Sequence, residues 1–395
     1  MVPIVGHLRR ELMVATLLAE LPCTEKLGEG TSGAVYGLTD SLDGKAYAVK
    51  VVALSETPTA QQTAECRLHA SLPAHEALVR YYFAWTTSDK LHILLERVDK
   101  ELWDVLEGDQ DTNLLERSRW ATALLSAVAC LHSHGIAHRD ISPWNCFVAA
   151  PQTPPESECR GQNPSKCRPL KLGDFGLAVR VPPTGSPAGH GGLFGWETDG
   201  FAPLDESAIG SFYSAPELGA EGGYDGKEVD VFSCGMTLFA IFHPILLQRS
   251  RDRAESAGSA TPVVPFAEQS DLTDCVERLK ADGMTLPTCW LDCDAKSQPL
   301  VQLVQRMVSH EPQRRPSAAE CLQLLSAALQ PWGVGGHGAP GKTQNARVGH
   351  RSKAQTGVTE ERPRGILGWT RWPSRASPRF LRGNASNKRI APQVV

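Results

Sequence analysis

The sequence predicts an α+β fold in two lobes, a small β-rich lobe followed by a larger, mostly α-helical lobe. The first lobe is expected over residues 21–96, where several segments alternate apolar and polar side chains, as strands with one buried face do. The second lobe is expected over residues 97–330, where apolar residues recur at helical spacing. Strands followed along the chain by helices are typical of an α+β architecture.

The first lobe contains signals for a hairpin, one main helix and two further strands. Residues 24–52 alternate as strand material, and Asp43-Gly44 marks a turn before the strand that ends at Lys50. Thr57-Pro58 is a typical helix start, because a capping residue is followed by proline in the first turn. The later elements are a helix from Thr59 to Leu72 and strands from Val79 to Ala84 and from Leu91 to Leu95.

The second lobe opens with a helix that has one continuous apolar face and that Gly135 ends. The residues on this face are Trp120, Leu124, Leu125, Val128 and Leu131. Further on, residues 149–169 form an insertion rich in polar residues and proline. We expect this insertion to be a surface loop between two short strands.

Charge is distributed unevenly along the chain. Residues 331–395 hold 12 Lys/Arg against 2 Asp/Glu, a net charge of +10. The whole chain carries −4, so residues 1–330 carry −14. We expect 331–395 to be a disordered basic tail, which either binds an anionic partner or simply extends into solvent. Residues 1–20 are expected to form an N-terminal extension that packs on the body as a helix.

Two features bear on where the protein is located. No apolar run approaches the roughly 20 residues needed to span a bilayer, so we expect no transmembrane segment. The 11 cysteines are odd in number and scattered, with Cys130, Cys146 and Cys234 in apolar runs. Such usage is typical of reduced thiols. We therefore expect the protein in the cytoplasm or the nucleus.

The first chemical motif is a glycine-rich loop, Gly28-Glu29-Gly30-Thr31-Ser32-Gly33. Such a loop can open a helix that binds a dinucleotide, with an acidic residue about 20 residues further on. Here strand-like residues follow, and the residue 17 positions after Gly33 is the cation Lys50. This order favours a β-ribbon over nucleotide phosphates, with the lysine of the next strand contacting them. Glu65, on the predicted helix, is the candidate carboxylate that orients Lys50.

Two acidic motifs follow in the second lobe, and both suit phosphoryl transfer. Asp140 lies in His138-Arg139-Asp140-Ile141-Ser142-Pro143-Trp144-Asn145, where its carboxylate can accept a hydroxyl proton and Asn145 can bind a metal ion. Asp174 opens Asp174-Phe175-Gly176 and can bind the magnesium ion that bridges nucleotide phosphates. His138 is expected to support the loop that contains Asp140, or else to be an ordinary core histidine.

Three later residues are expected to support this site from the second lobe. Asp230, at the start of an apolar helix, should brace the backbone of the loop that contains Asp140. Glu217, in Ser214-Ala215-Pro216-Glu217, and Arg315 are expected to form a buried ion pair, since an unpaired buried charge would be costly. The alternative is that Glu217 and Arg315 are two exposed charges.

In order and in residue type, these motifs resemble the eukaryotic protein kinase family over residues 24–325. The resemblance implies a bilobal protein kinase fold, ATP and magnesium as cofactors, and transfer of the terminal phosphoryl group to a hydroxyl of a protein substrate. It implies catalytic roles for Asp140, Lys50, Glu65 and Asn145, and magnesium binding by Asn145 and Asp174. The residues implied in ATP binding are Leu27, Gly28, Glu29, Gly30, Thr31, Ser32, Gly33, Val35, Ala48, Lys50, Glu96 and Val98. Residues 96–98 would be the hinge that reads adenine through backbone groups.

A finer resemblance points to two related branches of the family. Ser41-Leu42-Asp43-Gly44, residues 69–85 and the insertion before Asp174 are similar to Wee-type cell-cycle kinases. Residues 224–239 are equally similar to kinases of the initiation-factor-2 alpha subunit. Against the Wee type, the chain keeps Arg139, which that group usually alters. Both branches therefore stay open.

Ser142 is the main departure from the family pattern. Serine/threonine kinases have a lysine at this position, and tyrosine kinases have a cation at the position of Trp144 instead. Pro143 favours the serine/threonine class, so we expect a serine/threonine kinase. The alternatives are a Wee-type tyrosine-directed kinase and a nucleotide-binding pseudokinase scaffold. The scaffold is an alternative because loss of a positioned charge can cost several kcal/mol of transition-state stabilisation.

The segment between Asp174 and Glu217 is expected to regulate activity. Its hydroxyl-bearing residues include Thr198, Ser207, Ser211 and Tyr213. We expect phosphate on Thr198 or Ser207 to pair with Arg139 and to order the segment.

Overall fold

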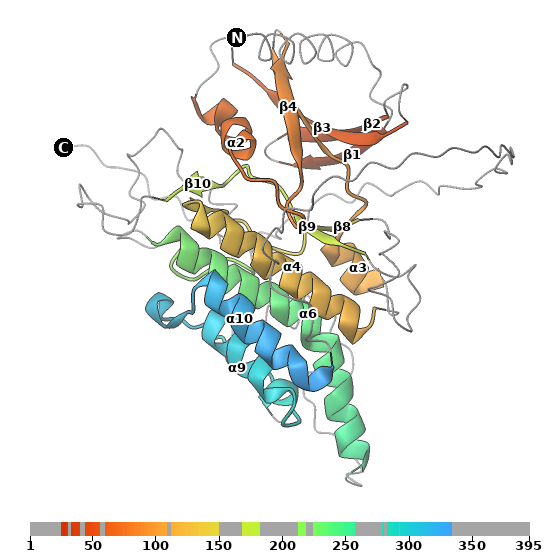
Figure 1. The fold of residues 1–395 in the computed structure, drawn as a ribbon, viewed down its shortest axis with the longest axis vertical. Helices are drawn as coiled ribbons and strands as arrows, with labels where there is room; N and C mark the ends of the chain where they lie inside the picture. The colour runs from red at the N-terminus through yellow and green to blue at the C-terminus, as the bar shows by residue number, and fades with distance from the viewer. Residues whose placement is uncertain are drawn as a thin grey trace, which may run out of the picture. The chain divides into compact units, whose positions relative to one another are not determined.

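The structure is a computed structural model of the chain. It describes residues 25–30, 33–39, 44–55, 60–87, 89–108, 112–149, 168–181, 212–218, 224–256, 276, 279, 283–291 and 293–333. These residues confirm the predicted bilobal α+β fold, with an antiparallel sheet in the first lobe and packed helices in the second (Figure 1). The predicted N-terminal extension, residues 150–167 of the insertion and residues 334–395 of the tail lie outside the described residues.

The first lobe is built on a five-stranded antiparallel sheet in the order β1-β2-β3-β5-β4. Its elements are β1 (Glu25–Gly30), β2 (Gly33–Thr39), β3 (Ala46–Ala53), α2 (Ala60–Ala70), β4 (Tyr81–Thr86) and β5 (Lys90–Glu96). Leu38, Val49 and Leu94, one from each of the three central strands, form its small core. The strands and the helix lie where the sequence predicts them, while Thr57-Pro58 and Asp43 lie outside the described residues.

The hairpin of β1 and β2 contains the glycine-rich loop. Gly30 pairs with Gly33 across the hairpin, and a strand follows Gly33. The strand rules out the helix that the dinucleotide alternative requires. Gly33 has a φ of 135°, and a Cβ there would lie 2.4 Å from the carbonyl oxygen of Val51. Only glycine avoids both this clash and the backbone strain.

The register of the central strands gathers several predicted site residues on one face of the sheet. Val35 of β2 lies opposite Lys50 of β3, and Ala48 lies opposite Leu95 of β5. Opposite residues in an antiparallel pair share a face, and so do residues two apart along a strand. Val35, Ala48 and Lys50 therefore point to the same side.

The second lobe has a helical core. Its helices are α3 (Leu102–Gly108), α4 (Leu114–Ser133), α6 (Gly226–Ser256), α8 (Thr288–Leu291), α9 (Gln298–Met307) and α10 (Ala318–Leu329), with short 3-10 turns at Pro312–Arg314 and Gln330–Trp332. α4 packs against α6 and α10, and its predicted apolar face is fully buried. Oδ1 of Asn113 caps α4 by accepting the backbone N–H of Glu116 at 3.0 Å. Gly135, with a φ of 68°, follows its last turn as predicted.

Helix α6 corrects one expectation from the sequence. By length and composition, residues Gly226–Leu246 could cross a membrane. The expectation that no apolar run approaches roughly 20 residues is therefore wrong. The reason for its apolar character is packing, because 89% of its most apolar stretch is buried inside the protein. This burial is typical of the central helix of a folded core.

Short strands hold the two acidic loops at one place. β7 (Ile136–Ala137) pairs with β10 (Val179–Arg180), and β8 (Cys146–Val148) pairs with both β6 (Lys100–Glu101) and β9 (Leu170–Leu172). Residues 138–145, here called the catalytic loop, therefore connect β7 to β8. Residues 173–178 connect β9 to β10, so both acidic motifs lie between the same two small sheets.

The base of the insertion is closed by contacts at both of its ends. β8 and β9 are the strands predicted on either side of it, and the N–H of Ala149 donates to the carbonyl oxygen of Pro169 at 3.0 Å. Arg168 forms an ion pair with Glu116 of α4 at 2.7 Å, and its carbonyl oxygen accepts Nε1–H of Trp120 at 2.9 Å. The chain therefore leaves and re-enters the lobe at one fixed point.

Candidate active site

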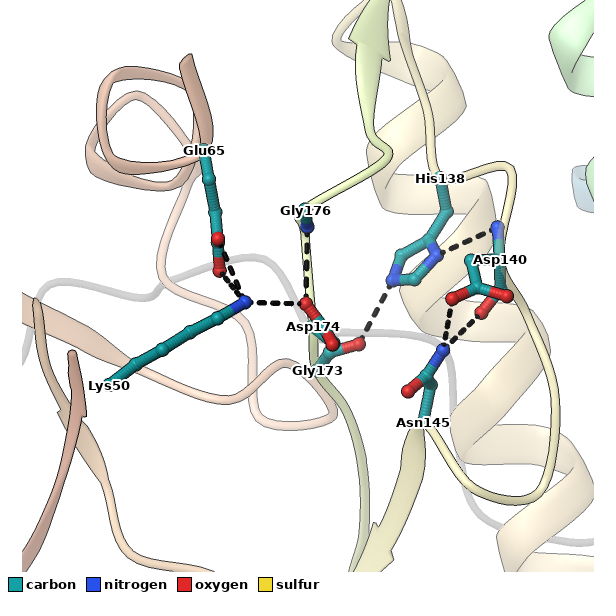
Figure 2. A network of polar contacts seen from close by, with 8 residues as sticks. All are labelled: Lys50, Glu65, His138, Asp140, Asn145, Gly173, Asp174 and Gly176. Atoms are coloured by element: carbon teal, nitrogen blue, oxygen red, sulfur yellow. Dashed lines mark hydrogen bonds and ion pairs between the residues drawn. The ribbon is translucent and has the colours of Figure 1, made fainter. Parts of the chain in front are cut away.

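Lys50 is the centre of a polar cluster formed by three segments of the chain. Its Nζ lies 2.7 and 2.8 Å from the two carboxylate oxygens of Glu65 and 2.8 Å from Oδ1 of Asp174 (Figure 2). Lys50 comes from β3, Glu65 from α2, and Asp174 from the loop after β9. The contact between Lys50 and Glu65 that the sequence predicts is therefore present, and it includes Asp174 as well.

The charges in this cluster depend on one another. Burial alone would lower the pKa of Lys50, but the carboxylates of Asp174 and Glu65 raise it above its ordinary value. Burial raises the pKa of Glu65, although Lys50 opposes this change. Burial also acts to raise the pKa of Asp174, but Lys50 and the backbone N–H of Gly176 bring it below its ordinary value. Lys50 and Asp174 are therefore both charged at neutral pH, as a phosphate and metal site requires.

Asp140 and Asn145 are joined across the catalytic loop. Nδ2 of Asn145 donates to Oδ2 of Asp140 at 2.7 Å and to its carbonyl oxygen at 2.8 Å (Figure 2). Burial raises the pKa of the Asp140 carboxyl, and the charge of Asp174 acts in the same direction. A carboxylate with a raised pKa accepts a proton more readily, which suits the expected role of a general base.

Asp230 of α6 holds the backbone of the catalytic loop. Its Oδ2 accepts the N–H of His138 and its Oδ1 accepts the N–H of Arg139, each at 2.7 Å. Nε2 of His132 lies 2.9 Å from the same Oδ2. Arg139 has a φ of 66°, which is uncommon for a residue other than glycine. The fully buried Asp230 thus braces the loop, as predicted, and stabilises this strained conformation.

Phe175 lies between two histidines from different elements. The centroid of its ring is 4.5 Å from the ring of His69 and 5.1 Å from that of His138. Nε2 of His138 lies 3.0 Å from the carbonyl oxygen of Gly173, so His138 supports both acidic loops. Burial lowers the pKa of His69 to about 4 and keeps that ring neutral. Sequence reasoning missed His69, although its position four residues after Glu65 puts it on the same face of α2.

Arg139 also reaches the segment that follows Asp174. Its Nε donates to the carbonyl oxygen of Leu177 at 2.7 Å, and its Nη1 donates to the hydroxyl of Tyr224 at 2.9 Å. These acceptors are neutral. Of the candidate phosphorylation sites, Thr198, Ser207 and Ser211 lie outside the described residues, and Tyr213 is buried.

Glu217 and Arg315 form the predicted ion pair. Both terminal nitrogens of Arg315 contact the carboxylate, with Nη2 at 2.9 Å from Oε2. The side chain of Arg315 is completely buried, and it also donates to the carbonyl oxygens of Ser309 and Glu228. The alternative of two exposed charges is therefore wrong.

The described residues among those predicted to bind ATP come from β1, β2 and β3 and from the end of β5. Leu27, Gly28, Glu29 and Gly30 belong to β1, Gly33 and Val35 to β2, and Ala48 to β3, whereas Thr31 and Ser32 lie outside the described residues. Glu96 ends β5 and Val98 follows it. The carboxylate of Glu96 accepts the backbone N–H of Arg80 at 3.2 Å and pairs with Lys171 at 3.1 Å. Because this side chain is engaged within the protein, a ligand at residues 96–98 would meet backbone groups.

The donor set suits magnesium. Within the described ranges, no group of three or more His, Cys, Asp or Glu side chains could hold a metal ion. Magnesium does not need such a group, since it is usually bound by one or two carboxylates together with phosphates and waters. Asp174 supplies a carboxylate. The amide oxygen of Asn145 points away from Asp140, because the amide nitrogen makes both contacts to that residue (Figure 2).

A bilobal α+β fold with a lysine–glutamate pair and two acidic loops is typical of protein kinases. The family model for the protein kinase domain matches residues 22–325. The chain belongs to this family.

Several known kinases are similar to the chain. CBL-interacting protein kinase 9 of Oryza sativa subsp. japonica is 29% identical over 220 residues, which cover 54% of this chain and 41% of that protein. CBL-interacting serine/threonine-protein kinase 16 of Arabidopsis thaliana is 27% identical over 302 residues, covering 74% and 54%. The membrane-associated tyrosine- and threonine-specific cdc2-inhibitory kinase wee-1.3 of Caenorhabditis briggsae is 31% identical over 160 residues, covering 40% and 22%. The chain thus spans about half the length, or less, of these curated relatives.

Proposed function

We propose that the protein is an ATP-dependent protein kinase that phosphorylates serine or threonine. The observation that supports this most strongly is that Lys50 contacts both Glu65 and Asp174. These contacts connect β3 and α2 of the first lobe to the loop that would bind metal, which a nucleotide site needs before transfer. The serine/threonine class is supported by Pro143 and by relatives named serine/threonine-protein kinases.

Each polar residue has a distinct role in this proposal. Lys50 binds nucleotide phosphates and is oriented by Glu65, while Asn145 and Asp174 hold magnesium, which neutralises phosphate charge when bound. Asp140 positions the substrate hydroxyl and accepts its proton. The hydroxyl oxygen forms a bond to the terminal phosphorus as the bond to the ADP oxygen breaks.

The direct test is phosphoryl transfer from labelled ATP by the purified full chain, onto itself and onto a mixed protein substrate. Asp140→Asn keeps the shape of the side chain but removes the base, so we expect incorporation to fall by at least about 100-fold. Asp89→Asn, an exposed carboxylate in the turn between β4 and β5, is the matched control and should retain activity. Acid hydrolysis of the product identifies the acceptor residue.

Ser142 supports a second candidate, a nucleotide-binding pseudokinase scaffold. It occupies the position of the usual lysine in the catalytic loop and is 4% exposed. The same experiment separates the two functions. Magnesium-dependent ATP binding without any incorporation by the wild-type chain would favour the scaffold and contradict the kinase.

The finer assignments are proposals with narrower support. A place near Wee-type kinases is supported by the partial similarity to wee-1.3, and a tyrosine-directed activity would appear as phosphotyrosine in the hydrolysate. The first relatives are instead mainly kinases named for interaction with CBL. The placement near Wee-type kinases therefore has less support than membership of the protein kinase family. Similarity to kinases of the initiation-factor-2 alpha subunit is supported only by residues 224–239.

Partners and location are also proposals. A protein substrate follows from the proposed activity. An anionic partner for residues 331–395 is supported by their charge alone. A cytoplasmic or nuclear location is supported by cysteine usage, and in the described part of the chain none of Cys66, Cys130, Cys146, Cys234, Cys293 and Cys321 is in a disulfide.

A further inference from the structure

The sheet of the first lobe has a second apolar face, away from Lys50. Lys50 and α2 lie on the inner face, since Glu65 of α2 contacts that lysine. The strand register places the alternate residues together on the other side, here called the outer face. The outer-face residues are Tyr36, Leu38, Tyr47, Val49, Val51, Phe83, Trp85, His92 and Leu94. A sheet face in contact with water normally carries polar residues, so this composition indicates a covered face.

The centre of the outer face is almost fully buried. Leu38 of β2 is 2% exposed, Val49 of β3 is 3% exposed and Leu94 of β5 is 4% exposed. Of the described helices, α2 packs on the sheet through β4, and it does so on the inner face. None of the helices that the structure describes has an extensive contact with the outer face. The burial therefore calls for a cover from another part of the chain.

Aromatic rings border this centre on the side of β4. The ring centroid of Trp85 lies 5.5 Å from that of Phe83 and 4.9 Å from that of His92, with which it is stacked at 10°. Nε1–H of Trp85 is buried and has no acceptor among the described residues. A buried donor without an acceptor is costly, so a segment that packs here can also stabilise the face by supplying one.

Residues 8–21, which lie outside the described residues, have the sequence of a helix with a wide apolar side. From Leu12 to Leu21 the polar residues are Thr16 and Glu20, which are four apart and so share one stripe. Val14 and Leu18, also four apart, lie on the opposite side of such a helix. Pro22 ends the helix, because a residue before proline disfavours the helical conformation. A helix of this kind needs another element on which to bury its apolar side.

The dimensions of this segment match the outer face. The three adjacent strands β2, β3 and β5 span about 10 Å, which is the width of one helix with its side chains. Pro22-Cys23-Thr24 connects the segment to Glu25, where β1 begins at the edge of the same sheet. Three extended residues reach about 10 Å, which is two strand spacings and thus the distance from β1 to β3. The end of the helix can therefore lie over the buried centre.

We propose that residues 8–21 form a helix that packs on the outer face and completes the core of the first lobe. Val14 and Leu18 contact the strip formed by Leu38, Val49 and Leu94, and the stripe of Thr16 and Glu20 faces water. Val49 precedes Lys50 and Val51 follows it, so the helix also steadies the strand that presents this lysine. The inference holds whether the protein is a kinase or a nucleotide-binding scaffold.

The competing explanation is that the outer face covers itself. In that case the rings around the centre would alone bury its three aliphatic side chains, and residues 8–21 would extend into solvent. A charge placed at Leu18 would then have no more effect than one placed at Thr16. The experiment must therefore locate Leu18 and compare the two sides of the helix.

Photo-cross-linking of the full chain locates the segment. The photo-reactive residue p-benzoylphenylalanine replaces Leu18, and mass spectrometry identifies the residue with which it forms a bond on irradiation. We expect bonds to outer-face residues of β2, β3, β4 or β5 in the same molecule. The same replacement at Thr16, on the polar stripe, is the matched control and should lose these bonds.

A mixture of isotope-labelled and unlabelled chains separates bonds within one molecule from bonds between two. Bonds between molecules would mean that a second copy, not the chain's own segment, covers the outer face. That result would overturn the proposal, and so would bonds to the helical lobe or no bond to the sheet.

Thermal unfolding measures whether the contact stabilises the protein. Leu18→Glu puts a charge at the centre of the buried side and is expected to lower the midpoint by about 5 °C. Leu18→Ala removes the same contact without a buried charge and should lower the midpoint by about 3 °C. Thr16→Glu adds the same charge to the polar stripe and should leave the midpoint unchanged. Equal midpoints for all three variants would contradict packing of this segment on the sheet.

Discussion

At the scale of one residue, the catalytic loop has Ser142 where serine/threonine kinases have a lysine. Ser142 lies between Asp140 and Asn145 and is almost fully buried. A positioned cation near the terminal phosphate stabilises charge that develops in the transition state. Ser142→Lys is therefore expected to raise kcat about tenfold, measured as transfer from labelled ATP at saturating substrate.

The matched control for this change is Ser142→Met, which adds comparable bulk without charge. It should show no increase in kcat. A lysine variant that binds ATP normally but is no faster than the methionine variant would show that the lost charge is not what limits this enzyme.

Single residues also show where sequence reasoning succeeds and where it stops. Lys50, Glu65, Asp140, Asn145 and Asp174 could be selected because motif spacing along the chain identifies them. The contacts of His69 with Phe175, of His132 with Asp230 and of Lys171 with Glu96 could not. Each joins segments whose proximity depends on how sheets and helices pack, and no local pattern encodes that packing.

At the scale of elements, α6 and the catalytic loop act as one unit through Asp230. Its two oxygens accept two backbone N–H groups and lie in a fully buried position. Asp230→Asn replaces one acceptor oxygen with a donor, so one N–H would face an amide NH₂. We expect a loss of about 3 kcal/mol in the free energy of unfolding and at least a hundredfold loss of kcat. Urea unfolding and the transfer assay measure the two effects.

The control for this element is Asp225→Asn, at the start of the same helix. Asp225 accepts the N–H of Lys227 at 2.7 Å, so its side chain caps the helix locally. It should cost only about 1 kcal/mol and leave kcat unchanged. Equal effects of the two variants would contradict a specific bracing role for Asp230.

At this scale, the sequence predicts the regular elements well and the start of α6 less well. The strands of the first lobe and the apolar face of α4 follow from periodicity, because one buried face imposes a repeat on the sequence. The apolar run in α6 was underestimated, because Lys227, Glu228 and Asp230 interrupt it near its start. Asp230 shows that such a charge can be buried when backbone donors surround it.

At the scale of the whole molecule, we predict that phosphate on the segment between Asp174 and Glu217 regulates activity. Arg139 presents its cation to neutral oxygens of Leu177 and Tyr224, and a phosphate would be a stronger acceptor. We expect the double variant Thr198→Ala/Ser207→Ala to lose about tenfold in activity, because no phosphate could then order the segment. The transfer assay, before and after phosphatase treatment, measures this.

Ser186→Ala, in the same segment, is the control and should retain activity. Phosphatase should lower the activity of wild type to that of the double variant. A double variant with wild-type activity would exclude phosphate on these two residues as the regulator.

The closed base of the insertion has a consequence for how this chain can be altered. β8 and β9, Arg168 with Glu116, and Trp120 fix both ends of residues 150–167 to the helical lobe. Because both ends of this segment are held in place, we expect a change in its length to leave the loops that contain Asp140 and Asp174 where they are. The position suits the insertion of a fluorescent reporter domain, and over generations it is a place where sequence can diversify at little cost to catalysis.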